Sequence, residues 1–377
     1  MNQMVTVPPP IPSDPMPIVF TGERGSFRRL VTRGAMLELV TAGFYRFWLA
    51  TDMRRHLWSH TVLDGDPAEY TGRPKELLIG FLIALGILTP VYLLYFLLGI
   101  EAERAQAFAS FPLFLFFYVF GQFAIYRARR YRLTRTVWRG VRFWMDGSGW
   151  AYAWRAALWG LFVVVTLGLA LPWREAALER YKMRHSHYGD LQGRFDGTGW
   201  GFFKRAWGLW LFAPTAILII PIPFLYGAFK AIEWKWWIEG IRFGDVHFES
   251  KLKSGDLIGL YWKTIGWVML AFLALGIYVS AATALYGIAG GHNIGELFTG
   301  GGARALPLVI LSAFGYLVTI LVTNIVVRVY LYRDVWQRVA ASVTVHRLDA
   351  AANVAAEGEL ASAVGEGIAD GLDVAGF

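Results

Sequence analysis

Long apolar runs without a charged residue alternate along this chain with short basic segments that are rich in aromatic side chains. A helix of about twenty apolar residues can cross the roughly 30 Å hydrocarbon layer of a bilayer. The pattern therefore predicts an all-α polytopic membrane protein with about seven apolar segments, each crossing the membrane or re-entering it. The uncharged segments are 77–99, 109–126, 156–172, 206–229, 264–291 and 305–327.

The remaining segment, 27–50, differs because it contains several charged side chains. A charge at the bilayer centre costs roughly 2.5–3.5 kcal/mol on insertion scales, so this is not a standard crossing helix. It is either an amphipathic interfacial helix whose arginines reach the headgroups, or a span whose charges face the protein interior. The residues alone support both interpretations. The charged side chains are Arg28, Arg29, Arg33, Glu38 and Arg46.

The basic segments give conflicting indications of topology. Seven arginines lie within 127–142, and positive segments beside membrane helices remain in the cytoplasm. The connectors 173–205 and 230–263 are also basic, yet a single crossing by 206–229 would place them on opposite sides.

Prolines in the fifth uncharged segment offer one resolution. Pro221 and Pro223 remove backbone donors and break a helix, which favours a re-entrant path for 206–229. Both adjoining connectors can then be cytoplasmic only if 156–172 is re-entrant as well. The sequence does not decide between crossing and re-entry for either segment.

Composition agrees with a membrane location. Of the 377 residues, 56% are hydrophobic and 17% are charged, against about 25% charged in soluble domains. Many of the 17 tryptophans flank the apolar runs, as expected for residues at a bilayer interface. The formal net charge is +8, and because the basic residues adjoin apolar runs we expect anionic phospholipids, not nucleic acid, as partners. The chain has no cysteine, which excludes disulfides, iron–sulfur clusters and cysteine nucleophiles.

Three parts of the chain are expected from its composition. Residues 1–19 are rich in proline, lack the apolar core of a signal peptide and read as a disordered tail. Residues 20–345 form the membrane domain. Residues 346–377 are rich in alanine, glycine and acidic side chains, and are expected to be a flexible tail.

The connectors resemble one another and indicate internal repeats. Each copy has a span that ends in aromatic residues, a basic-aromatic helix, a Gly/Asp turn, a further aromatic residue and often a glycine. The helix is expected in the membrane interface, and the turn reverses the chain because glycine adopts positive φ readily. The clearest turns are Asp64-Gly65, Gly189-Asp190 and Gly244-Asp245.

The order of these features resembles a known family. After the first helix come Phe47-Trp48, then Arg54-Arg55, then the stretch from His60 to Gly65, as in the YjgN-type bacterial membrane proteins, domain of unknown function 898. The resemblance covers approximately 18–345 and departs from the family pattern where charges interrupt the first helix. It implies a location in the bacterial inner membrane and no activity, because the family has none assigned.

Candidate site residues fall into two groups. The first would hold the connectors against anionic headgroups, through cations worth about 1 kcal/mol each and through tryptophan rings at the same depth. The second would line a path through the membrane, with polar groups inside a span and prolines that interrupt one. The first group is Arg54, Arg55, Trp58, Arg130, Arg180, Arg184, Lys235 and Trp236, and the second is Thr323, Asn324, Pro221 and Pro223.

Two histidine groups have spacings that occur in metal sites, but neither is expected to bind a metal. His185 and His187, with Asp190 nearby, are more typical of a wet interfacial turn. His56 and His60 share a helix face, but no glutamate follows His56 as it does in a metalloprotease helix. No Ser/His/Asp grouping is found either, so we predict no catalytic residue, no cofactor and no enzymatic activity.

Two functions remain open. One is transport or lipid handling, with a pathway near broken helices such as 206–229. The other is a non-catalytic structural or accessory subunit that packs against a larger membrane complex or a second copy of the chain. A continuous cavity with polar walls would favour the first function, and a solid core with a flat apolar flank would favour the second.

Overall fold

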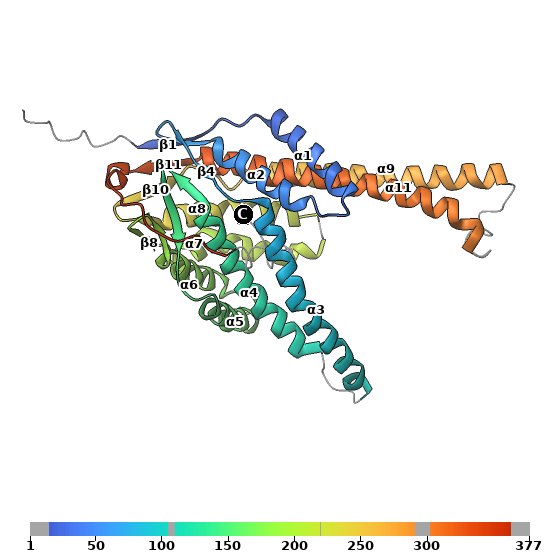
Figure 1. Cartoon of the computed structure of the whole chain (residues 1–377), viewed down its shortest axis with the longest axis horizontal. Helices are drawn as coiled ribbons and strands as arrows, with labels where there is room; N and C mark the ends of the chain where they lie inside the picture. Colours follow the sequence, from blue (N-terminus) through green and yellow to red (C-terminus); the bar gives the residue numbers. More distant parts are fainter. Residues whose placement is uncertain (1–14, 105–109, 219, 291–301, 363–377) are drawn as a thin grey trace, which may run out of the picture.

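A computed structural model describes residues 15–104, 110–218, 220–290 and 302–362 as helix pairs that project from an antiparallel sheet (Figure 1). In this part of the chain the sheet has 11 strands, in the order β3-β2-β1-β11-β10-β9-β8-β7-β6-β5-β4. The predicted all-α polytopic fold is therefore wrong. The sheet escaped the prediction because its strands have only two to five residues, too few to show an alternating pattern.

Short strands alternate with five-residue strands around the sheet. The short strands are β2 (Thr61–Leu63), β5 (Thr136–Trp138), β7 (Ser186–Tyr188), β9 (Ile241–Phe243) and β11 (Val343–His346). The five-residue strands are β1 (Met16–Phe20), β6 (Val141–Met145), β8 (Leu191–Phe195) and β10 (Val246–Ser250), together with 66–70, which comprises β3 (Asp66–Pro67) and β4 (Glu69–Tyr70).

Each five-residue strand pairs with two neighbours. In β6, Val141 and Arg142 pair with β5, whereas the next three residues pair with β7. In 66–70, Ala68 separates the residues that pair with β2 from those that pair with β5. Since β3 and β4 stand at the two ends of the strand order and are joined through Ala68, the sheet is a nearly closed barrel. Closure leaves few free strand edges.

The pairing of β1 with β11 joins distant parts of the chain. Met16 pairs with Val345 and Pro17 with Thr344. Residues 16–19 were predicted to belong to a disordered tail, but they complete the sheet. Their partners explain the difference, because β11 lies more than 300 residues away and no local pattern shows it.

One backbone hydrogen bond recurs wherever a helix meets the barrel in the described chain. The residue that follows each five-residue strand donates its amide to the carbonyl that precedes a short strand, at 2.8–3.0 Å. These bonds hold every such joint in the same geometry. They run from Thr21 to His60, Thr71 to Arg135, Asp146 to His185, Asp196 to Gly240 and Lys251 to Ser342.

The predicted Gly/Asp turns are the turns of β-hairpins. Asp64 and Gly65 both have positive φ, 51° and 80°, between β2 and β3. Gly189 and Gly244 have φ of 54° and 56° in the hairpins β7–β8 and β9–β10. Positive φ at such positions matches the twist of the paired strands, which explains the glycines.

In the described chain, the helices form segments that leave the barrel and return to it. Three short pairs are α1 (Arg24–Val40) with α2 (Arg46–Ser59), α5 (Gly149–Val165) with α6 (Leu171–Arg184), and α7 (Gly199–Phe212) with the 3-10 helix η1 (Ala213–Leu218) and α8 (Ile222–Gly240). Two long pairs are α3 (Pro74–Arg104) with α4 (Ser110–Thr134), and α9 (Ile258–Gly290) with α11 (Gly302–Val327), the π-helix η2 (Arg328–Asp334) and α12 (Val335–Ala341). The long pairs extend farthest from the barrel (Figure 1).

Among the described residues, three helical stretches are long and apolar enough to cross a membrane: Pro74–Leu98, Ile258–Ile288 and Leu306–Ala341. All three belong to the long pairs. The prediction of about seven apolar membrane segments is therefore too high, because the apolar residues of the short pairs form helices that are interrupted or have at most 19 residues.

The two segments with an undecided path both turn back towards the barrel. In 156–172 the chain reverses between α5 and α6, and in 206–229 it reverses through η1. Pro221 caps α8 and Pro223 lies in its first turn, so the predicted helix break at these prolines is confirmed. Because the adjoining basic connectors both reach the same sheet, their conflict in topology disappears.

The hairpin turns provide a test of the fold. Gly140 has a φ of 74°, and a Cβ there would meet no atom within 4 Å, so Gly140→Ala tests backbone strain alone. We expect a loss of about 1 kcal/mol in stability, measured as a lower thermal midpoint in detergent. Gly25→Ala is the control, because Gly25 is helical and equally open. Equal midpoints for the two variants would contradict the turn geometry.

Candidate functional site

Two adjoining cavities lie among the helices that lead into the barrel. We name them the sheet-side chamber, of about 360 Å³, and the charged chamber, of about 540 Å³. The sheet-side chamber is lined by Ile18, Trp58, Thr61, Arg129, Arg132, Leu133, Thr136, Trp234, Trp237, Ile238, Ile241, Phe248, Val335, Trp336, Val339, Ala340 and Val343. The charged chamber is lined by Arg129, Glu175, Glu179, Lys182, Tyr226, Lys230, Glu233, Trp234, Trp236, Trp237, Tyr261, Val327, Leu331, Tyr332 and Val335.

The two chambers follow one another along a common axis. Their walls share Arg129, Trp234, Trp237 and Val335. The wall formed by α11, η2, α12 and β11 takes every fourth residue from 327 to 343, so one helix face lines both cavities. At 1.5 Å per residue, the helical part of this face, from 327 to 339, is at most roughly 18 Å long. The charged chamber is lined by helix residues, whereas the sheet-side chamber is also lined by strand residues such as Ile18 and Phe248.

Indole rings give the sheet-side chamber its apolar surface. Trp58 and Trp336 stack with ring centroids 4.8 Å apart. The Trp58 indole donates to the Thr136 hydroxyl at 3.0 Å, and the Trp336 indole donates to the Thr61 hydroxyl at 2.9 Å. Both threonines are the first residues of short strands. Because these N–H groups are satisfied at the rim, the rings present only carbon to the cavity.

Ion pairs line the charged chamber. Arg129 Nη1 lies 3.1 Å from Glu179 Oε2, and Lys182 pairs with the other oxygen of the same carboxylate. Lys230 Nζ lies 2.6 Å from Glu233 Oε2 on the facing helix α8. The chamber therefore presents fixed charges of both signs, and the Glu179 side chain is only 9% exposed.

The carboxyl groups of this chamber differ in their electrostatic surroundings. Burial alone would raise the pKa of Glu179, but Lys182 and Arg129 lower it to about 2. Burial raises the pKa of Glu175, and this effect exceeds the opposing attraction of Arg174. Glu179 is thus a permanent anion, whereas Glu175 is the carboxyl of this wall that binds a proton more readily.

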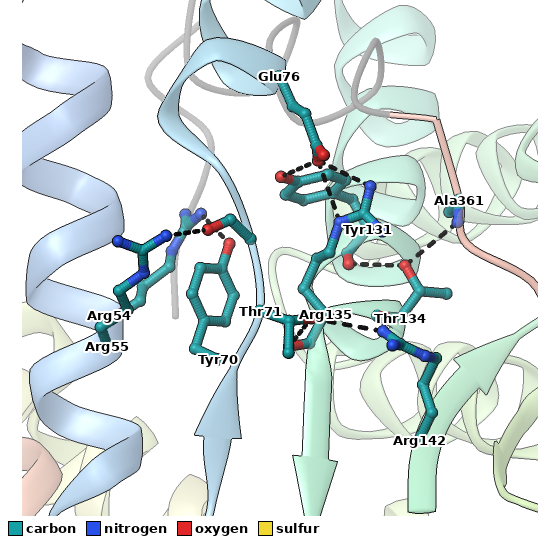
Figure 2. A network of polar contacts seen from close by, with 11 residues as sticks. Arg54, Arg55, Tyr70, Thr71, Glu76, Tyr131, Thr134, Arg135, Arg142 and Ala361 are labelled. Atoms are coloured by element: carbon teal, nitrogen blue, oxygen red, sulfur yellow. Dashed lines mark hydrogen bonds and ion pairs between the residues drawn. The ribbon is translucent and has the colours of Figure 1, made fainter. Parts of the chain in front are cut away.

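Arg54 and Arg55 lie in a polar network beside the junction of β4 and β5 (Figure 2). Arg54 Nη1 donates to the Tyr70 hydroxyl at 3.3 Å, and Arg55 Nη2 donates to the Gly72 carbonyl at 2.8 Å. Both guanidinium groups therefore hold the strand 66–70 to α2. Their predicted contact with lipid headgroups stays a prediction.

The same network continues into α4. The Glu76 carboxylate accepts hydrogen bonds from Arg135 at 2.7 and 3.1 Å and from the Tyr131 hydroxyl at 3.0 Å (Figure 2). The Thr71 amide donates to the Arg135 carbonyl at 2.8 Å. The network thus fastens the start of α3 to the end of α4 at the point where the barrel closes.

The other predicted headgroup residues are dispersed. Arg180 and Arg184 are exposed on α6, and Lys235 lies 3.8 Å from Glu239. The Arg130 Nε group is buried with no hydrogen-bond partner. The two tryptophans of that group are internal. Trp58 lines the sheet-side chamber, and Trp236 is only 4% exposed.

Trp236 is a core residue of α8. Its ring stacks on Phe202 at 4.6 Å and meets Phe195 edge to face at 5.0 Å. Its indole donates to the Thr198 carbonyl at 3.1 Å. The ring joins α7 and β8 to α8, which leaves the exposed cations as the members of the group that face outward.

The predicted path residues do not line the axial chambers. Asn324 lines a separate cavity of about 230 Å³ between α1 and α11, and Pro221 and Pro223 lie at a helix tip. Beside this cavity Glu38 forms two bonds with Arg328, at 2.8 and 3.3 Å. The hydroxyl of Thr323 is buried without a hydrogen-bond partner.

The charges of the first helix thus divide between two environments. Glu38 faces the protein interior through its pair with Arg328, whereas Arg28, Arg29 and Arg33 are exposed. The predicted single helix 27–50 is wrong, because the chain turns at 41–45 into α2, and most of these charges lie on α1. Its hydrophobic face, with Phe27 and Val31 fully buried, packs on α2.

The histidine groups are part of the fold. Among the residues described, no set of three His, Cys, Asp or Glu side chains has the arrangement of a metal site. His185 bonds Asp146 at 2.8 Å, whereas His187 stacks on Trp144 at 4.1 Å. Asp190 instead accepts a hydrogen bond from the Ala355 amide at 3.1 Å.

Sequence reasoning missed the residues of the charged chamber. Glu179 with Lys182 and Lys230 with Glu233 are spaced i,i+3, which is a recognisable signal for pairs on one helix face. Such pairs are common on solvated surfaces, so their spacing alone does not reveal that they face an internal cavity.

His56 provides a pH-dependent test. Burial, with the nearby His60 and Arg333, lowers its pKa to about 4 from an ordinary 6.5. Between pH 4 and 6.5 the imidazole is therefore protonated more in the unfolded chain than in the folded one. The contribution of neutral His56 to the free energy of unfolding is fully present above about pH 6.5 and is lost as the pH falls towards 4. His56→Gln should have a flatter dependence of thermal midpoint on pH from 7 to 4, and Gly25→Ala, which adds no titratable group and meets no atom within 4 Å, should keep the original slope. Equal slopes for His56→Gln and the unmodified protein would contradict this.

Comparison with known proteins identifies a family without a function. A family model described as "Bacterial protein of unknown function (DUF898)" matches residues 15–233, more than half of the chain. No curated protein and no solved structure matches the chain. The matched region includes β1 to β8 and the α6 wall of the charged chamber. The chain therefore belongs to this family of bacterial proteins of unknown function, as its sequence pattern indicated.

Proposed function

We propose that this protein is a multi-pass protein of the bacterial inner membrane that binds an amphipathic molecule in its axial chambers, in transport or lipid handling. The observation that supports this is the succession of a charged chamber and an apolar, tryptophan-lined chamber on one axis. A molecule with a charged part and an apolar part matches both chambers at once. Its charged group finds ionic partners in the charged chamber, and its apolar part contacts only apolar side chains in the sheet-side chamber.

The ion pairs of the charged chamber suit reversible binding of a headgroup. Arg129 and Lys182 share one carboxylate, Glu179. An anionic group on a ligand can compete with that carboxylate for the two cations, and an ammonium group can pair with Glu233 or Glu175. A zwitterionic headgroup, whose ammonium pairs with the displaced Glu179 carboxylate, keeps the buried charges paired and avoids the cost of an isolated charge.

Charge distribution supports a cytoplasmic position for the barrel. The exposed cations Arg180, Arg184 and Arg194 all lie on the barrel side of the short pairs. Positive residues beside membrane helices stay in the cytoplasm. The long pairs then cross the membrane and return.

We also regard the recurring units of helix pair and short strand as internal repeats. The amide-to-carbonyl bond at each helix–strand joint supports this. We propose that the chain binds its ligand without a catalytic step.

Filling the sheet-side chamber tests the binding proposal. Ala340 lines this chamber and is 8% exposed, so Ala340→Trp would occupy the space of a ligand. We expect loss of the bound amphipathic molecule, measured by mass spectrometry of what co-purifies from native membranes. Ala350→Trp, at an exposed site, is the control and should retain it.

A second variant covers the case in which Ala340→Trp does not fold. Glu179→Gln keeps the shape of the wall and removes its anion, so the co-purifying molecules should change in amount or headgroup. The same molecules in the same amounts in both variants would overturn the proposal and favour an accessory subunit that contacts lipid only on its outer surface.

Labelling tests the orientation. The chain has no cysteine, so Lys251→Cys, exposed just after β10, provides a single thiol. A membrane-impermeant thiol reagent should label it only after the cells are opened. Labelling in intact cells would place the barrel on the periplasmic side.

A further inference from the structure

We propose that the tips of the three short helix pairs insert into the acyl chains of one leaflet only, the leaflet next to the barrel. The tips lie at 41–45, at 166–170 and at 213–218 with 220–221, between the helices of the short pairs. The partner surface is thus the hydrocarbon of a single leaflet, whereas the long pairs cross both. This inference rests on the membrane location proposed above.

Two of the tips have the same structure. Thr41-Ala42-Gly43 and Thr166-Leu167-Gly168 both place their second and third residues at positive φ, 48° and 89° in the first and 50° and 90° in the second. In both, the threonine hydroxyl donates to the carbonyl four residues earlier and accepts the amide four residues later, at 2.7–3.1 Å. The tip is therefore a defined element that occurs twice.

These tips satisfy their own backbone. The amides from 41 to 46 and from 166 to 171 all donate within the tip, at 2.7–3.3 Å. A turn on a wet surface can leave such donors to water. Internal pairing of every donor is the condition for entry into hydrocarbon, where an unsatisfied group costs several kcal/mol.

The side chains at the tips are apolar and exposed. Val40 is 82% exposed, Leu167 92% and Ile217 86%. Each lies among further exposed apolar residues of the same tip, such as Phe44, Val165 and Leu218. Contiguous exposure of this kind is unfavourable in water and is removed by an acyl-chain environment.

The length of the short pairs limits their depth. The first helices α1, α5 and α7 have 17, 17 and 14 residues, or roughly 21–26 Å including the part that packs against the barrel. That is less than the roughly 30 Å hydrocarbon core, and α3, with 31 residues, is roughly 46 Å long. Because part of each short helix packs at the barrel, the remainder is shorter than the hydrocarbon core, and the tips end within the bilayer.

Tryptophans and cations mark the level of the headgroups on these helices. Trp154 on α5 and Trp207 on α7 are 56% and 55% exposed, one to four turns before the tips. Arg155 is exposed beside the first, and Lys204 lies 5.6 Å from the Trp200 ring. On α5 and α7 the indole rings and basic side chains lie near one another, and the residues between them and the tips are uncharged, which is typical of the bilayer interface.

Spin labels measure this placement directly. A single nitroxide would be attached at Leu167→Cys or Ile217→Cys in the full-length protein, in vesicles of phosphatidylethanolamine and phosphatidylglycerol. The measurement compares the collision of each nitroxide with oxygen, which concentrates in the hydrocarbon, and with a water-soluble nickel complex. These side chains are exposed and make no core contact, so the fold should tolerate the changes. Arg184→Cys is the aqueous control, and Leu93→Cys, 54% exposed on α3, is the control for a crossing helix.

We expect the nitroxide at Arg184→Cys to be more accessible to the nickel complex, and the nitroxides at Leu167→Cys and Ile217→Cys to be more accessible to oxygen. We also expect that impermeant thiol reagents added on the far side of the membrane react with neither tip cysteine. Nickel access at the tips with oxygen access at Leu93 would overturn the single-leaflet insertion and leave the membrane location intact. Nickel access at Leu93 as well would overturn the membrane location and, with it, this inference. Thiol labelling of the tips from the far side would show that the short pairs cross.

Discussion

The closed antiparallel ladder is the constraint on which the rest of the structure depends. Strands of three residues are not stable alone, and a two-stranded hairpin is marginal in water. Here each five-residue strand divides its hydrogen bonds between two neighbours, so every hairpin is stabilised by the next one. The ladder also determines where each helix pair starts and ends, because bonds such as that from Asp196 to Gly240 join the end of a five-residue strand to the end of the helix that precedes the next short strand.

The axial chambers follow from that arrangement. Helices that enter a barrel side by side cannot fill its axis with backbone, so the axis is filled by side chains or left as a cavity. Large indoles that bond to threonines at the rim, as Trp58 does to Thr136, are held back from the centre. Farther from the sheet, α6 and α8 carry Glu179 and Lys230, which pair with Lys182 and Glu233 one turn along the same helix. The change from a charged to an apolar cavity thus follows from the order in which charged and apolar residues occur along these helices.

The sequence predicted helices apolar and long enough to cross a membrane, the family, the Gly/Asp turns and the helix break at Pro221. These features depend on local composition or on φ at single positions, both of which are visible in a few residues. The barrel was not predictable in the same way, because its pairs are formed between units, as Val345 with Met16 illustrates.

Burial was equally hard to foresee. Trp236 and Lys235 are neighbours in a basic-aromatic helix and read alike in sequence, yet one stacks on Phe202 in the core and the other is partly exposed beside Glu239. Which face of a helix is internal depends on contacts with segments that are distant in the chain. The axial position of Arg129 and Glu179, 50 residues apart, was hidden for the same reason.

The pairing of β1 with β11 also has a consequence for biosynthesis. Translation produces Met16–Phe20 first and Val343–His346 more than 300 residues later, so the barrel can close only when the last strand has left the ribosome. Until then β1 keeps one open edge, and an unfinished chain exposes strand edges that invite aggregation. Closure thus distinguishes a complete chain from a truncated one, and a quality-control protease that recognises open edges would remove the truncated product selectively.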